Sequence, residues 1–296
     1  MSASPPEPAL DSDPAEPVAR PSHNGRELTI RVVSALALIA IVLAVTILPT
    51  QGMPFHEPWP FLVMISIGIA LLSIEWGFMA APRASARIAC AVAAAAICGL
   101  FVGYLGHPLL SVLILAFGAL CAGLYALRLG AGWMDAAYGV FYIGFPGIVI
   151  MWLRQGTDGV EWVMFAFFIA WGADSAAYLV GRLAGGPKLW QRYSPNKTWS
   201  GFAGGLIAGM LTAGSLSDLT HLFKHDTSAS IVGLIVALAT MAGDLWESAL
   251  KRRFGVKDAG SLIPGHGGLM DRVDGLMFAI VDLGIIRLLV LLGTQI

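Results

Sequence analysis

Long apolar runs separated by short polar segments make up most of the chain. Each run holds about 20 mostly apolar residues, the length that an α-helix needs to cross the hydrocarbon core of a bilayer. The predicted spanning helices are residues 30–49, 60–80, 86–105, 108–127, 134–153, 160–180, 201–217, 230–250 and 274–293. The seventh run is rich in glycine and is the least certain, so totals of eight or ten spanning helices are the alternatives. The pattern predicts an all-α, polytopic integral membrane protein with about nine transmembrane helices.

Composition supports this interpretation. Hydrophobic residues make up 57% of the chain and charged residues only 12%, whereas soluble domains carry about 25% charged residues. Residues 1–27 differ, because they combine prolines with Asp, Glu and Ser and hold few aliphatic side chains. We expect a disordered tail there, since such a segment cannot bury enough apolar surface to fold. It also lacks the basic-then-apolar order of a signal peptide.

Two polar segments are longer than the others and carry most of the candidate chemistry. They are residues 181–200 and 251–273. We therefore divide the chain into a disordered cytoplasmic tail at 1–27, N-terminal transmembrane helices at 28–159, and a C-terminal catalytic transmembrane region at 160–296 that contains both loops.

The distribution of Lys and Arg predicts which side of the membrane these loops face, because cytoplasmic loops carry an excess of basic residues. With nine helices and the N-terminus inside, the outer loops hold only Arg154 and Lys224 of the 18 Lys and Arg residues, and Arg287 lies within the last helix. We therefore expect both long loops in the cytoplasm, and the protein in the inner (plasma) membrane of a bacterium.

The eighth apolar run ends in polar residues that share one helical face. Asp244, Glu247, Ser248 and Lys251 lie at i, i+3, i+4 and i+7, spacings that point the same way on a helix. Asp244 lies roughly 12 Å inside the cytoplasmic end, where a carboxylate needs a partner or a cation. The alternative is a helix end with snorkelling basic residues and an internal Glu–Lys pair, which does not account for Asp244.

The loop after this helix is rich in glycine. Three glycines surround His266, and glycines permit the close backbone approach that phosphate-binding loops need. His266 itself is a candidate general base, a candidate metal ligand or a hydrogen-bonding loop residue.

Two carboxylates follow at the start of the ninth helix. Asp271 and Asp274 lie at i and i+3, where Asp274 also favours the helix dipole. Antiparallel packing of the last two helices would bring Asp244 and Asp271 together as oxygen ligands for Mg²⁺. Neutralisation without a metal, by Lys257 and Arg272, is the competing account.

The sixth helix and the segment after it form a second polar cluster. Asp174 and Tyr178 lie at i and i+4 on one face of the helix. Basic residues and small polar groups that suit phosphate oxygens follow: Arg182, Lys188, Arg192, Ser194, Asn196, Lys197 and Thr198. Positive-inside topology alone accounts for Arg182 and Lys188, but less well for the compact sequence SPNKTW at a helix start.

The segment from Ser248 to Asp274 resembles the signature of the phosphatidate cytidylyltransferases, also called CDP-diacylglycerol synthases. It fills the pattern S-x-L-K-R-x₄-K-D-x-G-x₂-I-P-x-H-G-G-L-x-D-R-V-D at every fixed position. The sequences DSAAYLVGR and SPNKTWSGFAGG also resemble segments of this family, so the resemblance covers residues 170–282. Ser200 departs from the family, whose members often carry Glu or Gln there.

The resemblance implies transfer of a cytidylyl group from CTP to phosphatidate, giving CDP-diacylglycerol and pyrophosphate for phospholipid synthesis. It implies that Asp244 and Asp271 bind Mg²⁺, and a second bound cation is an open alternative. It also implies that Asp244, Asp271, Lys251 and His266 are the catalytic residues. It also implies a homodimer, and we expect no nucleic-acid partner. The predicted substrate-binding residues are Arg252, Lys257, Asp258, Arg272, Ser194, Lys197, Thr198, Asp174, Tyr178 and Arg182.

Two other functions stay open. A polyprenol kinase would also use CTP, but would transfer the γ-phosphate and release CDP. An ion-coupled transporter would use intramembrane carboxylates as carriers, namely Glu75, Asp174, Asp244 and Asp282, although no inverted repeat is visible. Asp282 and Arg287 lie at i and i+5, a poor pair on one helix, so we expect each to have another partner.

Overall fold

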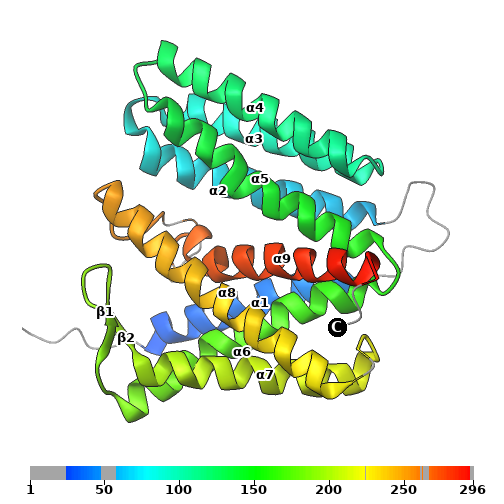
Figure 1. Cartoon of the computed structure of the whole chain (residues 1–296). Helices are drawn as coiled ribbons and strands as arrows, with labels where there is room; N and C mark the ends of the chain where they lie inside the picture. The colour runs from blue at the N-terminus through cyan, green and yellow to red at the C-terminus, as the bar shows by residue number, and fades with distance from the viewer. Residues whose placement is uncertain (1–24, 48–57, 224, 261, 263–266, 294–296) are drawn as a thin grey trace, which may run out of the picture.

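The computed structural model describes residues 25–47, 58–223, 225–260, 262 and 267–293, with side chains from residue 33 onward. In this part of the chain the structure is a bundle of nine α-helices (Figure 1), which confirms the all-α fold class. The helices are α1 (Gly25–Ile47), α2 (Trp59–Ala80), α3 (Ser85–Tyr104), α4 (Pro108–Arg128), α5 (Trp133–Gln155), α6 (Gly159–Ala184), α7 (Trp199–Thr220), α8 (Asp226–Arg253) and α9 (Met270–Leu291).

The chain is an integral membrane protein with several spanning helices. Within the described residues, seven helices, α2 to α8, are long and apolar enough to cross a membrane. The glycine-rich seventh run is one of them. The described apolar part of α1 is shorter, Val33–Ile47, and α9 carries five charged residues. The predicted tail lies outside the described residues, except that 25–27 begin α1.

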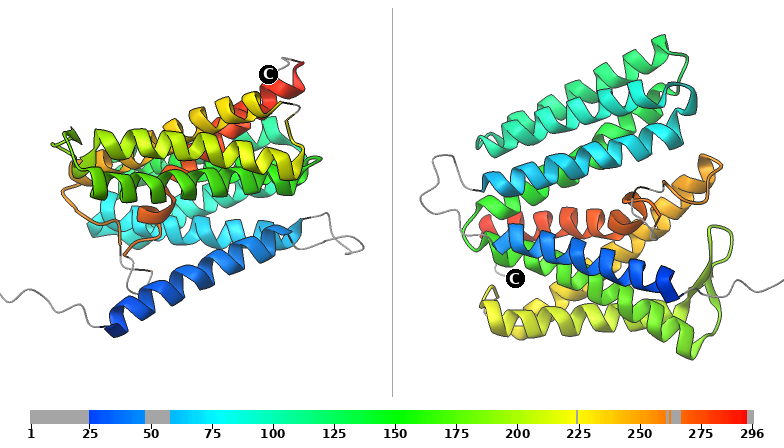
Figure 2. Two further views of the ribbon diagram at one scale, coloured as in Figure 1. Left: turned by 90° about the horizontal axis from the view of Figure 1, so that it is seen from below. Right: turned by 180° about the vertical axis from the view of Figure 1, so that it is seen from behind.

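The helices form two packed groups joined by α9 (Figures 1 and 2). Helices α2, α3, α4 and α5 pack on one another in one group, and α6, α7 and α8 pack in the other. Helix α9 contacts α5, α6 and α8, and α1 contacts α2 and α6. The start of α9 therefore lies where side chains from both groups can reach it.

Small residues let the helices of the second group approach closely. A Cβ on Gly201 of α7 would lie 2.5 Å from the carbonyl oxygen of Ala177 in α6. A Cβ on Gly209 would lie 2.9 Å from the carbonyl oxygen of Gly233 in α8. Close backbone contact of this kind drives helix association in membranes, so the glycines of α7 serve packing and do not interrupt the helix.

The segment predicted as the loop 181–200 contains a small β-hairpin. Helix α6 continues to Ala184, and the strands β1 (Lys188–Trp190) and β2 (Ser194–Thr198) then pair antiparallel, with Lys188 opposite Thr198 and Trp190 opposite Ser194. The hairpin places its polar residues over the ends of α6 and α7.

Arg287, near the end of α9, has a partner other than Asp282, as the sequence predicts. Its guanidinium donates to the carbonyl oxygens of Leu153 (2.6 Å), Trp152 (3.2 Å) and Thr157 (3.4 Å). The last carbonyls of a helix have no partner within that helix, so Arg287 satisfies the end of α5. For Asp282 the expectation is not confirmed, because its Oδ2 accepts no hydrogen bond within the described residues.

Substituting Arg287→Met should lower the free energy of unfolding by about 2–3 kcal/mol, because buried carbonyl groups lose their donors. Denaturant titration of the purified protein in detergent measures this change. The control is Arg128→Met, at an exposed position in the last turn of α4, which should cost less than about 1 kcal/mol. Equal effects of the two substitutions would refute the assignment.

Candidate functional site

One cavity of about 1170 Å³ opens between α6, α8, α9 and the hairpin. Apolar side chains from α1, α2, α5, α6 and α9 line part of it, among them Leu38, Ile69, Ile150, Trp171 and Met277. Polar side chains line the rest: Asp174, Ser175, Tyr178, Arg182, Lys188, Ser194, Asn196, Lys197, Thr198, Asp244, Lys251, Asp271, Arg272 and Asp274. The cavity can therefore accept a ligand with one charged and one apolar part.

Most of the predicted site residues meet at this cavity. Those that line it are Asp244, Asp271, Lys251, Arg272, Ser194, Lys197, Thr198, Asp174, Tyr178 and Arg182. Arg252, Lys257 and Asp258 are exposed and do not line it. His266 lies outside the described residues.

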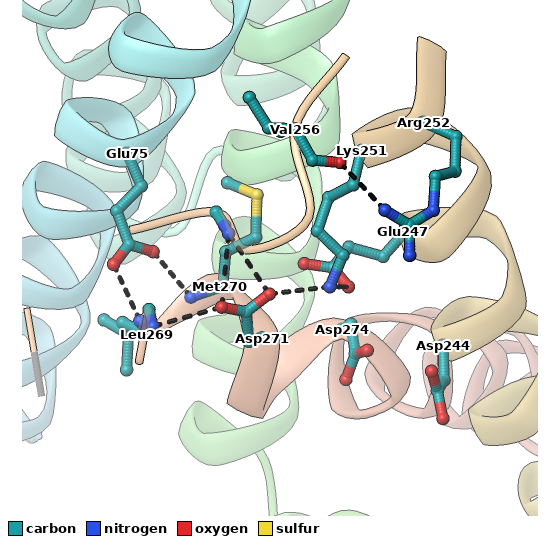
Figure 3. Close-up of polar contacts among 12 residues, drawn as sticks. Glu75, Asp244, Glu247, Lys251, Arg252, Val256, Leu269, Met270, Asp271 and Asp274 are labelled. Carbon is teal, nitrogen blue, oxygen red and sulfur yellow. Dashed lines mark hydrogen bonds and ion pairs between the residues drawn. The ribbon is translucent and has the colours of Figure 1, made fainter. Parts of the chain in front are cut away.

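The ammonium group of Lys251 joins α8 to α9 at the cavity wall (Figure 3). Lys251 Nζ lies 2.6 Å from Glu247 Oε2, one turn earlier on α8, and 2.6 Å from Asp271 Oδ1 on α9. Only 1% of the Glu247 side chain and 12% of the Asp271 side chain are exposed. One cation therefore lies between two largely buried carboxylates and neutralises one unit of their charge.

Asp271 also holds the two ends of the glycine-rich loop. Its carboxylate accepts hydrogen bonds from the backbone N–H groups of Ala259 (3.2 Å) and Gly268 (3.1 Å). Gly267 has a φ of +88°, a conformation that side chains other than glycine rarely adopt. Asp271 is thus fixed by α8 and by both sides of the loop.

Asp244 forms an ion pair with Lys197 of β2. The pair links α8 to the hairpin across the polar part of the cavity, and both side chains are 30% exposed. Burial lowers the pKa of Lys197, while the negative charges of Asp274 and Asp174 act to raise it. Lys197 is therefore a cation surrounded by several carboxylates from α6, α8 and α9.

Two carboxylates at this site are more closely involved than the sequence indicates. Asp274 is buried and lines the cavity beside Asp271, although a favourable helix dipole alone could have explained it. Glu247 is paired with Lys251 but was not assigned to the site. Each lies three positions after a predicted site residue: Asp274 after Asp271, and Glu247 after Asp244. This helical spacing is the sequence signal that could have found them. Figure 3 shows these groups along the junction of α8 and α9.

The hydroxyl groups of the hairpin hold its base together. Thr198 is buried, and its Oγ1 accepts a hydrogen bond from the backbone N–H of Gly201 at 3.1 Å, so it caps α7. Ser200, the residue that departs from the family pattern, lies 2.9 Å from Thr198 Oγ1 and donates to the carbonyl oxygen of Gly185. Thr198 thus has a structural role besides lining the cavity.

The donor set can hold a magnesium ion only together with ligands from a substrate. Among the described residues no group of three or more His, Cys, Asp or Glu side chains is placed to hold a metal. Mg²⁺, however, is commonly bound by one or two carboxylates together with substrate phosphates and water. Asp244 and Asp271 line the same cavity, with Asp274 between them (Figure 3), so a carboxylate oxygen from this wall fits such an ion when phosphates supply the other ligands.

The sequence matches a known family over most of its length. Residues 29–289 match the family model described as "Cytidylyltransferase family". This match extends over both helix groups, whereas the resemblance seen in the motifs covers only the C-terminal part.

Several curated proteins are similar to this chain, and all three of the following are named phosphatidate cytidylyltransferase. That of Brucella melitensis biotype 1 is 36% identical over 255 residues, which cover 85% of this chain and 90% of that protein. That of Staphylococcus epidermidis is 39% identical over 154 residues, or 52% of this chain and 59% of that protein. That of Staphylococcus saprophyticus is 40% identical over 159 residues, with the same coverage.

Substituting Lys251→Met should destabilise the protein by about 3–5 kcal/mol, because it leaves two carboxylates uncompensated. The double variant Glu247→Gln/Lys251→Met should recover part of this loss, since it removes one of the two charges. Denaturant titration of the single and double variants completes a double-mutant cycle. Strictly additive losses would show that Lys251 and Glu247 do not interact.

Proposed function

The chain belongs to the cytidylyltransferase family, and we propose that it transfers a cytidylyl group from CTP to phosphatidate, giving CDP-diacylglycerol and pyrophosphate. The relatives' names support this activity. The structural observation that carries it is the cavity with one charged and one apolar part. Phosphatidate has the same division, since its phosphate is anionic and its acyl chains are apolar.

The substrates fit the two parts of the cavity. The apolar lining on α1, α2 and α5 suits an acyl chain, which loses little by leaving the bilayer for it. The polar lining offers five basic residues to the phosphates: Arg182, Lys188, Lys197, Lys251 and Arg272. CTP would enter from water at the ends of the helices while the lipid stays in the membrane.

The reaction needs positioning and charge neutralisation more than proton transfer. A phosphate oxygen of phosphatidate attacks the α-phosphorus of CTP, a new P–O bond forms, and the bond to the β-phosphate breaks to release pyrophosphate. The attacking oxygen is already anionic, so little general-base catalysis is required. The barrier lies in bringing two polyanions together and stabilising the leaving group, which lysine and arginine side chains can do.

We assign Asp244 and Asp271 as the protein ligands of Mg²⁺. The ion, when bound, supplies charge neutralisation to the phosphates. Lys197 contacts Asp244, and it would be available to a phosphate when Asp244 holds the ion. The exposed residues Arg252, Lys257 and Asp258, and His266, stay predicted substrate or catalytic contacts from the signature alone.

The site faces the cytoplasm in this proposal. The excess of Lys and Arg in the loops next to the cavity supports that orientation, and CTP is a cytoplasmic substrate. In a bacterium the membrane is then the inner one. The homodimer implied by the family resemblance stays a prediction.

The position of the label transferred from CTP tests the reaction. Purified protein would receive phosphatidate, Mg²⁺ and CTP labelled either in the cytosine or at the γ-phosphate. We expect label in the lipid extract only from cytosine. Transfer from the γ-phosphate alone would indicate a kinase, and absence of label from both, in folded protein, would contradict the proposed activity and favour transport.

Asp244→Asn should lower kcat roughly 100-fold or more, because the amide cannot replace the charge that holds the metal, an interaction worth several kcal/mol. The same lipid-labelling assay measures the loss, and thermal unfolding checks the fold. Asp218→Asn, at an exposed position on α7, is the control and should leave activity unchanged. Normal turnover by Asp244→Asn would remove this residue from the metal site.

A further inference from the structure

Glu75 is a buried carboxylate outside the cavity and without a part in the proposed chemistry. It lies on α2, near the end of that helix, and only 1% of the residue is exposed. Its Oε1 accepts a hydrogen bond from the backbone N–H of Leu269 (2.8 Å), and its Oε2 accepts one from that of Met270 (2.7 Å). Figure 3 shows Glu75 reaching the start of α9 from the opposite side to Lys251.

These hydrogen bonds cap α9 from another helix. Helix α9 begins at Met270, and its N-cap residue, Leu269, makes no side-chain cap of its own. The first N–H groups of a helix have no partner within the helix, and a negative charge beside them is stabilising. Glu75 satisfies two of them with charge-assisted hydrogen bonds.

The glycine-rich loop closes directly on this carboxylate. A Cβ on Gly260 would lie 2.8 Å from Glu75 Oε1, and one on Gly268 would lie 3.0 Å from the same oxygen. Side chains larger than hydrogen would crowd the carboxylate where it binds the start of α9. These two glycines therefore have a packing role that does not depend on a bound phosphate.

We propose that Glu75 is a positioning residue that fixes the first turn of α9 and so sets the carboxylate of Asp271 at the cavity. Asp271 follows Met270 directly, and it binds the N–H groups of Ala259 and Gly268 on the two sides of the loop. Four backbone N–H groups are thus held by two carboxylates from different helices. The proposal rests on the proposed function, in which Asp271 is a metal ligand.

The first test measures the hydrogen bonds themselves. Glutamine keeps the shape of Glu75, but only one of its two terminal atoms accepts a hydrogen bond. In Glu75→Gln, hydrogen–deuterium exchange at Leu269 and Met270 should become roughly ten- to a hundredfold faster. Exchange in α7 should not change. Unchanged exchange at the start of α9 would overturn the proposal, whatever the activity.

The second test separates positioning from a general loss of stability. We expect kcat of Glu75→Gln to fall roughly ten- to a hundredfold, as misplacement of a catalytic group does. The Mg²⁺ concentration for half-maximal activity should rise, while KM for phosphatidate stays constant. The control is Asp226→Asn, which neutralises an exposed first-turn carboxylate of α8. A less stable variant with normal kcat and Mg²⁺ dependence would reduce Glu75 to a structural residue.

A second variant covers the case in which Glu75→Gln does not fold. Gly260→Ala crowds Glu75 Oε1 without removing its charge and should produce the same local exchange and the same change in Mg²⁺ dependence. Gly214→Ala is its control, because the added Cβ would meet only Ser230 Oγ, at 3.3 Å. Wild-type protein that makes no CDP-diacylglycerol would refute the proposed function, whereas active wild type with Gly260→Ala indistinguishable from it would refute this inference.

Discussion

Charge inside an apolar helix bundle has to be compensated where it lies, and the contact of Lys251 with Glu247 and Asp271 meets this requirement at the cavity. Removing one member of a buried ion pair leaves the other uncompensated at high cost. The triad therefore fixes α8 against α9, and with them the wall that carries Asp244 and Asp274. The position of the glycine-rich loop depends on the same triad, because the two ends of the loop donate hydrogen bonds to Asp271.

The first helix group acts as a frame for this wall. Arg253, at the end of α8, forms an ion pair with Asp135 of α5 at 2.5 Å, and Trp246 of α8 donates to the Tyr138 hydroxyl at 2.6 Å. Together with Glu75 on α2, these contacts tie both ends of the loop to helices that carry no recognisable motif. The family match extends over nearly the whole chain, as expected if the site depends on contacts with these N-terminal helices.

The apolar cores of the helices could be predicted because they follow from local hydrophobicity, but polar ends were missed: α8 begins at Asp226 and α9 at Met270, each four residues before the predicted start. The shared face of Asp244, Glu247 and Lys251 followed from helical spacing in the same way. The contact of Glu75 with Met270 could not be predicted, because it joins positions 195 residues apart. Nothing in the sequence around either residue indicates that the other is its partner. The hairpin was missed because two short polar strands show little alternation of polar and apolar residues. Nor does a signature reveal which residues of its loop face the cavity, as Arg252, Lys257 and Asp258 show.

The pairing of lysines with carboxylates suits a site that must receive polyanions from water. Bare lysines beside an apolar cavity would be costly to desolvate, and bare carboxylates would repel a triphosphate. Lys197 contacts Asp244 and Lys251 contacts Asp271, so these lysines and carboxylates compensate one another before the substrates arrive. Under the proposed function, Asp244 and Asp271 would hold the cation, and Lys197 and Lys251 would be available to the phosphates.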